Sequence, residues 1–214
     1  MYGSGDGPRF PMSETNVALM HELLGLLKAI PDCRMARGIR FPQWYLLLVA
    51  LLSILSGGQS LRDHERFARR HHDELTQQLG LSLKRSPSDT AFRALFEKLE
   101  PEQLNRVLQQ WMLNHPSLQG PLESLLCDGK TLRGSRQPGQ DVSQTFVAVV
   151  TVYVQALGVA LAQASYSTDT SHEQAALQGL LIDLPIEEAV VQADALHTTQ
   201  DFFVSLRREE PVTS

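Results

Sequence analysis

LESLLCDGKTLRGS, residues 122–135, is the stretch that decides how this chain folds. Its apolar start, Leu122 to Cys127, predicts a short strand whose end delivers one acidic side chain, Asp128. A glycine and the basic residues Lys130 and Arg133 follow. A carboxylate at the end of a strand is held rigidly yet faces solvent. That placement suits a metal ion or phosphate chemistry.

A second stretch, VVQADALHTTQ at residues 190–200, has the same design, because an apolar strand there leads into Asp194. The two acids are 66 positions apart (194 minus 128), which is too far for one hairpin and suits opposing positions in one sheet. An alternative stays open for the first stretch. Asp128-Gly129 is also a common hairpin-turn signature, because both residue types tolerate positive φ.

The composition is that of a globular protein, with 214 residues of which 43% are hydrophobic. The longest apolar run, Trp44 to Ile54, is shorter than the roughly 20 residues that a membrane span needs, so it predicts a buried helix and no membrane partner. The N-terminus does not resemble a secretion leader. Cys33 and Cys127 are not at motif spacing, which favours a reducing, cytoplasmic setting.

The net charge of −5 argues against an unqualified nucleic-acid binder, since such proteins usually carry a basic excess. The charge is unevenly placed. Residues 121–214 carry 5 Lys/Arg and 12 Asp/Glu, a net of −7, which leaves 14 against 12, or +2, for residues 1–120. An acidic C-terminal part would suit a cation site, and a solvated acidic surface is the simpler alternative.

Residues 1–15, rich in Gly, Ser and Pro, predict a disordered tail, and residues 16–118 predict an all-helical domain. The helical period, the capping residues and the Gly and Pro stops indicate five helices. They are expected over residues 16–29, from Pro42 to Gly57, 60–79, from Ser88 to Leu99, and from Pro101 to 114.

Three histidines on the expected helix over 60–79 raise the question of a metal site. His64, His71 and His72 have the spacing i, i+7, i+8, which lacks the i, i+4 pair that a helical metal site needs. We therefore interpret them as part of a solvated helix face.

Basic residues in the helical part raise the question of DNA contact. Arg34, Arg37 and Arg40 lie every third residue in one loop, where they could touch a phosphate backbone or be solvated. Two helices meeting across the turn from Gly80 to Pro87 could form a helix-turn-helix with Arg93 exposed, although no pattern of base-reading side chains accompanies it.

Beyond residue 118 the pattern changes from a helical to a strand period. A β-branched run at residues 145–154 and a second run at residues 159–164 predict a hairpin. Residues 174–182 predict a helix, residues 190–193 a strand and Thr198 the start of a helix. The fold class is therefore α+β, with an N-terminal all-helical domain followed by a domain with a mixed sheet.

These residues resemble a known family. CDGKTLRGS and ADALHTTQ look like the motifs of the H-repeat-associated (ISAs-type) insertion-sequence transposases of the DDE superfamily, and IPDCRMARGIRFP and PSDTAFR are similar to the domain that precedes the nuclease in that family. The resemblance spans about Leu24 to the C-terminus. It implies that residues 119–214 form an incomplete ribonuclease H-like catalytic domain.

The resemblance assigns roles residue by residue. Asp128 and Asp194 match the first two catalytic carboxylates and metal ligands of a two-metal site for Mg²⁺ or Mn²⁺, and we expect them on neighbouring parallel strands, roughly 4 to 6 Å apart. Lys130, Arg133 and His197 would lie near the DNA.

The family's third acid follows a fifth strand, which this chain lacks. The resemblance therefore implies a C-terminally truncated DDE transposase with an incomplete metal site and uncertain enzymatic activity. Its implied partners are double-stranded DNA at transposon ends and either a second copy of the chain or a full-length transposase. Two alternatives remain: a non-catalytic regulator that binds DNA or transposase, and a stand-alone metal-dependent nuclease.

Overall fold

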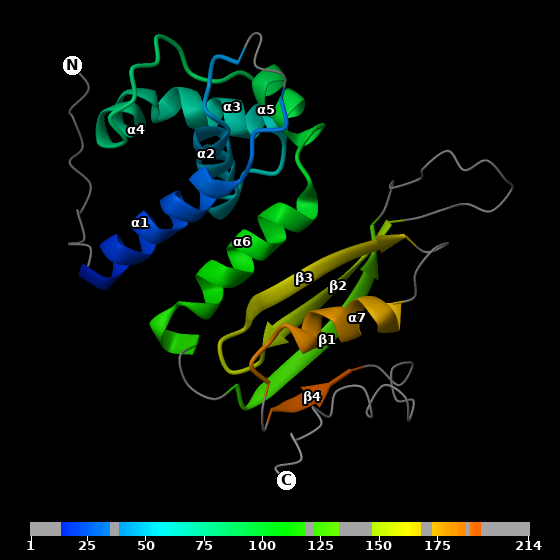
Figure 1. Ribbon diagram of the computed structural model, residues 1–214. Coiled ribbons are helices and arrows are strands. Elements are labelled where there is room, and N and C mark those ends of the chain that lie inside the picture. Colours follow the sequence, from blue (N-terminus) through cyan, green and yellow to red (C-terminus); the bar gives the residue numbers. More distant parts are fainter. Residues whose placement is uncertain are drawn as a thin grey trace, which may run out of the picture. The chain divides into compact units, whose positions relative to one another are not determined.

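The computed structural model describes residues 14–34, 39–118, 122–132, 147–167, 173–186 and 189–193. Within these ranges the chain forms seven α-helices and a four-stranded mixed sheet, which fits the expected α+β class (Figure 1). Its contacts divide the chain into two units, residues 1–100 and 101–214. The change in sequence pattern predicts a domain boundary at residue 118. The boundary between the two contact units lies earlier, because the helix over residues 101–113 packs against a strand of the sheet.

The first unit consists of five helices. They are α1 (Glu14–Ala29), α2 (Gln43–Leu55), α3 (Leu61–Arg70), α4 (His72–Gln78) and α5 (Asp89–Phe96). α2 contacts α1, α3 and α5, and eight of its residues are buried, as its mostly apolar sequence predicts. Gln43 is the polar exception at the start of α2. Its side-chain amide donates to the backbone carbonyl of Pro31 at 2.9 Å, which gives this carbonyl, just after α1, a hydrogen-bond partner.

The helix expected over residues 60–79 is in fact two helices, because α3 ends at Arg70 and α4 begins at His72. Its start is as predicted. Ser60 is the N-cap residue of α3, its hydroxyl accepts from the backbone N–H of Asp63, and it donates to the Asp63 carboxylate at 2.7 Å. A ring nitrogen of His72 lies 3.1 Å from the carbonyl of Leu83, a contact that ties α4 to the loop after it.

The second unit contains the sheet. Its elements are α6 (Pro101–Leu113), a 3-10 turn (Pro116–Leu118), β1 (Ser124–Thr131), β2 (Val147–Val154), β3 (Val159–Ser167), α7 (Glu173–Ile182) and β4 (Val190–Gln192). The strand order is β3-β2-β1-β4, with β1 to β3 antiparallel and β4 parallel to β1. The expected parallel pairing of the two motif strands is thereby confirmed.

The two faces of the sheet differ. One face carries Leu125 of β1 with Val150 and Val152 of β2, and α7 covers it with Leu177 and Leu181 (Figure 1). Because side chains alternate along a strand, Asp128 and its neighbour Thr151 lie on the other face.

α6 packs against β3 at the edge of the sheet. There Glu102 accepts a hydrogen bond at 2.7 Å from Ser165, which alternates with the core-facing residues of β3. The two helices of this unit thus lie on different sides of β3.

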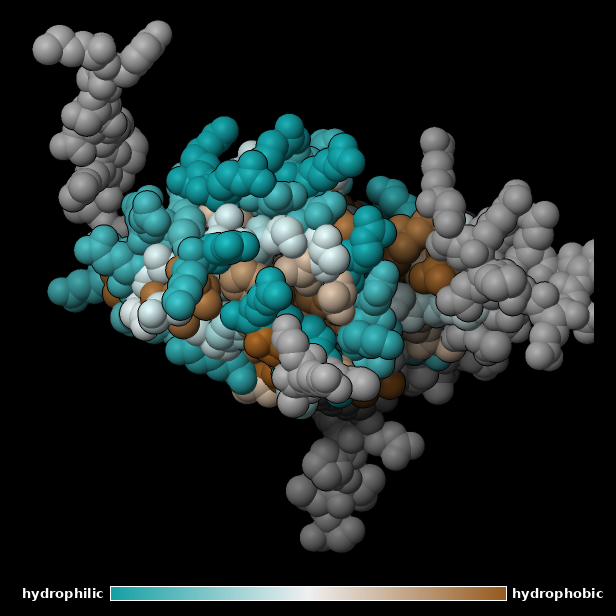
Figure 2. All heavy atoms as spheres, turned by 90° about the horizontal axis from the view of Figure 1, so that it is seen from above, coloured by the Kyte–Doolittle hydropathy of each residue, from teal (hydrophilic) through white to brown (hydrophobic). Residues whose placement is uncertain are grey.

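The exposed surface is largely polar. On the face that Figure 2 shows, hydrophilic side chains predominate and hydrophobic ones lie among them in small groups. Ile54 and Leu55, at the end of α2, are among the exposed apolar residues. No helix in the described ranges combines the length and the apolar character that crossing a bilayer requires.

Candidate functional site

Asp128 lies inside β1 and not at its end. The strand continues through Gly129 to Thr131, and Asp128 is paired with Thr151 of β2. The expectation of a strand-terminal carboxylate was therefore wrong, and so is the hairpin-turn alternative for Asp128-Gly129. β1 continues because β2 supplies a paired residue for each of these positions.

The open face of the sheet around Asp128 is polar. The Asp128 side chain is 51% exposed, and its Oδ2 lies 3.1 Å from Nζ of Lys130, two residues along the same strand face. This contact raises the pKa of Lys130, first through the hydrogen bond to Asp128 and then through its charge. Beside Asp128 on the same face, the amide of Gln163 donates to the buried Thr151 hydroxyl at 3.3 Å.

The described residues do not by themselves form the metal site that the family resemblance implies. Among them, no three His, Cys, Asp or Glu side chains come together closely enough to hold an ion. Asp128 contributes one carboxylate, and its observed counter-ion is the ammonium of Lys130. A single exposed carboxylate does not make a metal site, so the fit depends on a second acid.

The parallel pairing of β1 with β4 is where a second acid is expected. Ser124 is opposite Val190, and Leu126 is opposite Gln192, so each pair is separated by 66 positions (190 minus 124, 192 minus 126). Asp194, Arg133 and His197 lie outside the described residues.

On the covered face of β1, Gly129 lies against the carboxyl group of Glu173, the first residue of α7, so closely that a Cβ at position 129 would overlap it. The Tyr166 hydroxyl of β3 donates to Oε2 of Glu173 at 3.3 Å. We did not expect this contact from the sequence. A glycine inside a strand often marks the close approach of another group, and that was the available signal.

Residues 24–112 match the family described as DDE_Tnp_1-associated. This segment, 89 of the 214 residues, is similar to that domain. The domain occurs in DDE transposases, so the resemblance to that superfamily is confirmed.

A curated relative extends the similarity beyond the DDE_Tnp_1-associated domain. Protein YbfL of Escherichia coli (strain K12) is 26% identical over 192 residues, which is 89% of this chain and 49% of YbfL. The chain thus spans about half the length of that relative. No solved structure shows a significant match to the chain.

Within residues 24–112, His64 does not lie on the solvated helix face that we expected for the three histidines. His64 is buried, its Nδ1 lies 3.0 Å from the Ser53 hydroxyl, and its ring meets the Phe92 ring edge to face. Burial lowers the pKa of His64, and the charge of Asp63 partly opposes this. His64 is therefore a core residue, which the spacing of the three histidines could not reveal.

The basic loop of the domain is partly structural. Arg34 forms an ion pair with Asp32 at 2.7 Å and donates to the carbonyl of Phe41 at 2.9 Å, and its side chain is only 12% exposed. It is neither a solvated cation nor a free phosphate ligand. Arg40 is exposed, and Arg37 lies outside the described residues.

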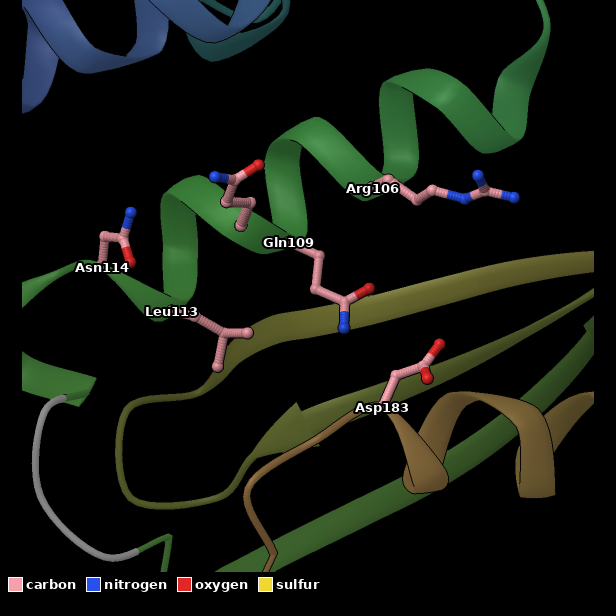
Figure 3. A pocket seen from close by; sticks show the side chains of 6 residues that line it. Arg106, Gln109, Leu113, Asn114 and Asp183 are labelled. Atoms are coloured by element: carbon pink, nitrogen blue, oxygen red, sulfur yellow. The ribbon is translucent and has the colours of Figure 1, made fainter.

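A shallow pocket of about 270 Å³ lies elsewhere in the second unit, between α6 and the segment after α7. In Figure 3 the side chains of Gln109 and Leu113 point toward β3, and the Asp183 carboxylate points toward α6. Its lining residues are Arg106, Gln109, Gln110, Leu113, Asn114 and Asp183. Neither Asp128 nor Lys130 lines it, so it is separate from the candidate site.

Proposed function

We propose that this chain acts in DNA transposition as part of a DDE-type transposase, with Asp128 and Asp194 as the paired acids of its nuclease site. The observation that carries this proposal is the parallel register of β1 and β4. Leu126 is opposite Gln192, and two further steps of the same register would put position 194 opposite position 128. Side chains of opposite residues in neighbouring strands share a face, so both carboxylates would project from the open face of the sheet.

The sheet supports a ribonuclease H-like assignment for the second unit. Three antiparallel strands come first, a helix covers one face, and the next strand joins the edge of β1 in parallel. This is the order in which a ribonuclease H-like domain would bring the ends of the CDGK and ADAL motifs together.

Two neighbouring carboxylates are hard oxygen ligands, which Mg²⁺ and Mn²⁺ prefer. A bound divalent ion would supply a Lewis acid and an activated water for phosphodiester cleavage. The chain's own residues would hold the ion through Asp128 and Asp194 and attract the phosphate backbone through Lys130, Arg133 and His197.

DNA binding is part of the same proposal. Exposed cations of the first unit, among them Arg62, Arg70 and Arg93, form no ion pair within the described part of the chain. Free cations are the groups that displace counterions from DNA phosphates. They would let the helical unit engage DNA in spite of the net charge of −5.

The experiment is metal-dependent nicking of supercoiled DNA that carries the transposon ends. Nicking in Mg²⁺ or Mn²⁺ that Asp128→Asn and Asp194→Asn each abolish would support the proposal. Glu123→Gln, which changes an exposed acid just before β1, is the matched control and should nick like the wild type. Equal nicking by wild type and Asp128→Asn would contradict a catalytic role for Asp128.

A second candidate is a non-catalytic regulator that binds transposon-end DNA or a full-length transposase. One observation favours it: the family match covers residues 24–112 and ends before β1 begins at Ser124. Gel-shift titration of the whole chain at several salt concentrations separates the candidates. Salt-dependent binding that Asp128→Asn retains, with no nicking by the wild type, would favour the regulator.

A further inference from the structure

Gly129 is a glycine because of space and not because of backbone conformation. Among the described glycines, positive φ occurs at Gly57, Gly80 and Gly158, so the backbone of Gly129 would accept a side chain. The space for that side chain is occupied by the carboxyl group of Glu173. The carboxylate therefore lies directly on the β1 backbone.

A hydrogen bond from β3 also holds the Glu173 carboxylate in this position. Tyr166 of β3 donates its hydroxyl to Oε2 of Glu173, and both the burial of this ring and the nearby carboxylate charge raise the pKa of Tyr166. The contact joins the start of α7 to β1 and β3. We refer to Gly129, Tyr166 and Glu173 as the carboxylate clasp.

The clasp lies immediately behind the candidate catalytic acid. Asp128 precedes Gly129 and projects from the opposite face of the sheet, so Glu173 supports the peptide that carries Asp128 but does not share its solvent-facing side.

We propose that Glu173 is a positioning residue that fixes the β1 backbone at Asp128 by packing its carboxylate on Gly129. This inference rests on the proposed function, because Asp128 needs a fixed direction only if it works with a partner. Removing a group that orients a metal ligand typically weakens metal binding by about 10- to 100-fold.

The test measures Mn²⁺ affinity of the whole chain by electron paramagnetic resonance and exchange of the β1 amides by NMR. Glu173→Ala removes the carboxylate and Gly129→Ala displaces it. Both should raise the Kd for Mn²⁺ by about 10-fold or more and speed amide exchange at residues 128–130. Glu173→Gln keeps an acceptor for Tyr166 and should restore most of the affinity. Glu102→Ala, which removes a carboxylate bonded to β3 on the other face, is the matched control and should change neither quantity.

The outcomes separate this inference from the proposed function. If Asp128→Asn abolishes Mn²⁺ binding while Glu173→Ala and Gly129→Ala bind as the wild type does, the positioning role is wrong and the metal site stands. If Asp128→Asn has no effect on Mn²⁺ binding, the metal site fails. In that case amide exchange alone tests whether Glu173 fixes the β1 backbone. Unchanged exchange at residues 128–130 in Glu173→Ala would show that it does not.

Discussion

Leu126 of β1 lies opposite Gln192 of β4 in a parallel pair, and this register connects the two sequence motifs. A one-residue shift would move every side chain of β4 to the other face of the sheet. In the register that the structure has, two acids separated by the same 66 positions would be directly opposite each other and would share one face.

A cysteine cross-link tests whether this register continues to Asp194. In a chain with Cys33→Ser and Cys127→Ala, the pair Asp128→Cys and Asp194→Cys should form a disulfide on mild oxidation, because opposite residues on neighbouring strands are within the Cα range of about 4.4 to 6.8 Å that a disulfide needs. The pair Lys130→Cys and Asp194→Cys, two positions out of register, should form it much more slowly. Mass spectrometry of the oxidised peptides measures both. Equal yields would argue against the continued register.

The core beneath the site gives a stability prediction. Leu125 is fully buried and Leu132, just after β1, is 46% exposed. Leu125→Ala should lower the free energy of unfolding by about 2 to 5 kcal/mol, because it leaves a cavity under α7. Leu132→Ala should change the free energy by less than about 0.5 kcal/mol. Urea unfolding followed by circular dichroism compares them, and similar losses would place Leu125 outside the core.

The N-caps of α3 and α5 give a second matched pair. The Ser60 hydroxyl accepts from the N–H of Asp63, whereas Ser88 makes no side-chain cap hydrogen bond. Ser60→Ala should destabilise the helical unit by about 0.5 to 2 kcal/mol, and Ser88→Ala should have a clearly smaller effect. Thermal unfolding of the two variants measures the difference. A Ser88→Ala loss as large as that of Ser60→Ala would contradict the assigned caps.

Buried His64 predicts a pH dependence. Its pKa is lowered in the folded state, chiefly by burial, so folding favours the neutral ring. The resulting stability is present in full above the unfolded pKa of about 6.5 and is lost as the pH falls through the folded-state pKa. The free energy of unfolding should therefore drop more between pH 8 and pH 5 in the wild type than in His64→Gln. An identical drop in both proteins would show that His64 does not titrate with folding.

Local patterns were sufficient to predict most of the secondary structure. The β-branched run of β2 and the apolar starts of β3 and β4 identify strands, because their side chains pack on a pleated, half-buried surface. The capping pair Ser60 and Asp63 marks the start of α3 for a local reason too, since both partners are within one helical turn.

Features that depend on distant contacts could not be predicted in this way. Asp128 sits mid-strand because β2 extends beside it, although Asp-Gly alone favours a turn. His64 is buried because Ser53 of α2 and Phe92 of α5 reach it. The contact of Glu173 with Gly129 joins residues 44 positions apart (173 minus 129). The only sequence signal for it is a glycine inside a strand.

The most direct test of the central claim is Mn²⁺ binding to the whole chain by electron paramagnetic resonance. If Asp128 and Asp194 hold one shared cation site, the wild type binds Mn²⁺, each of Asp128→Asn and Asp194→Asn weakens that binding by at least about 10-fold, and Glu123→Gln binds as the wild type does. Unchanged Mn²⁺ affinity in either Asp128→Asn or Asp194→Asn would contradict the shared site.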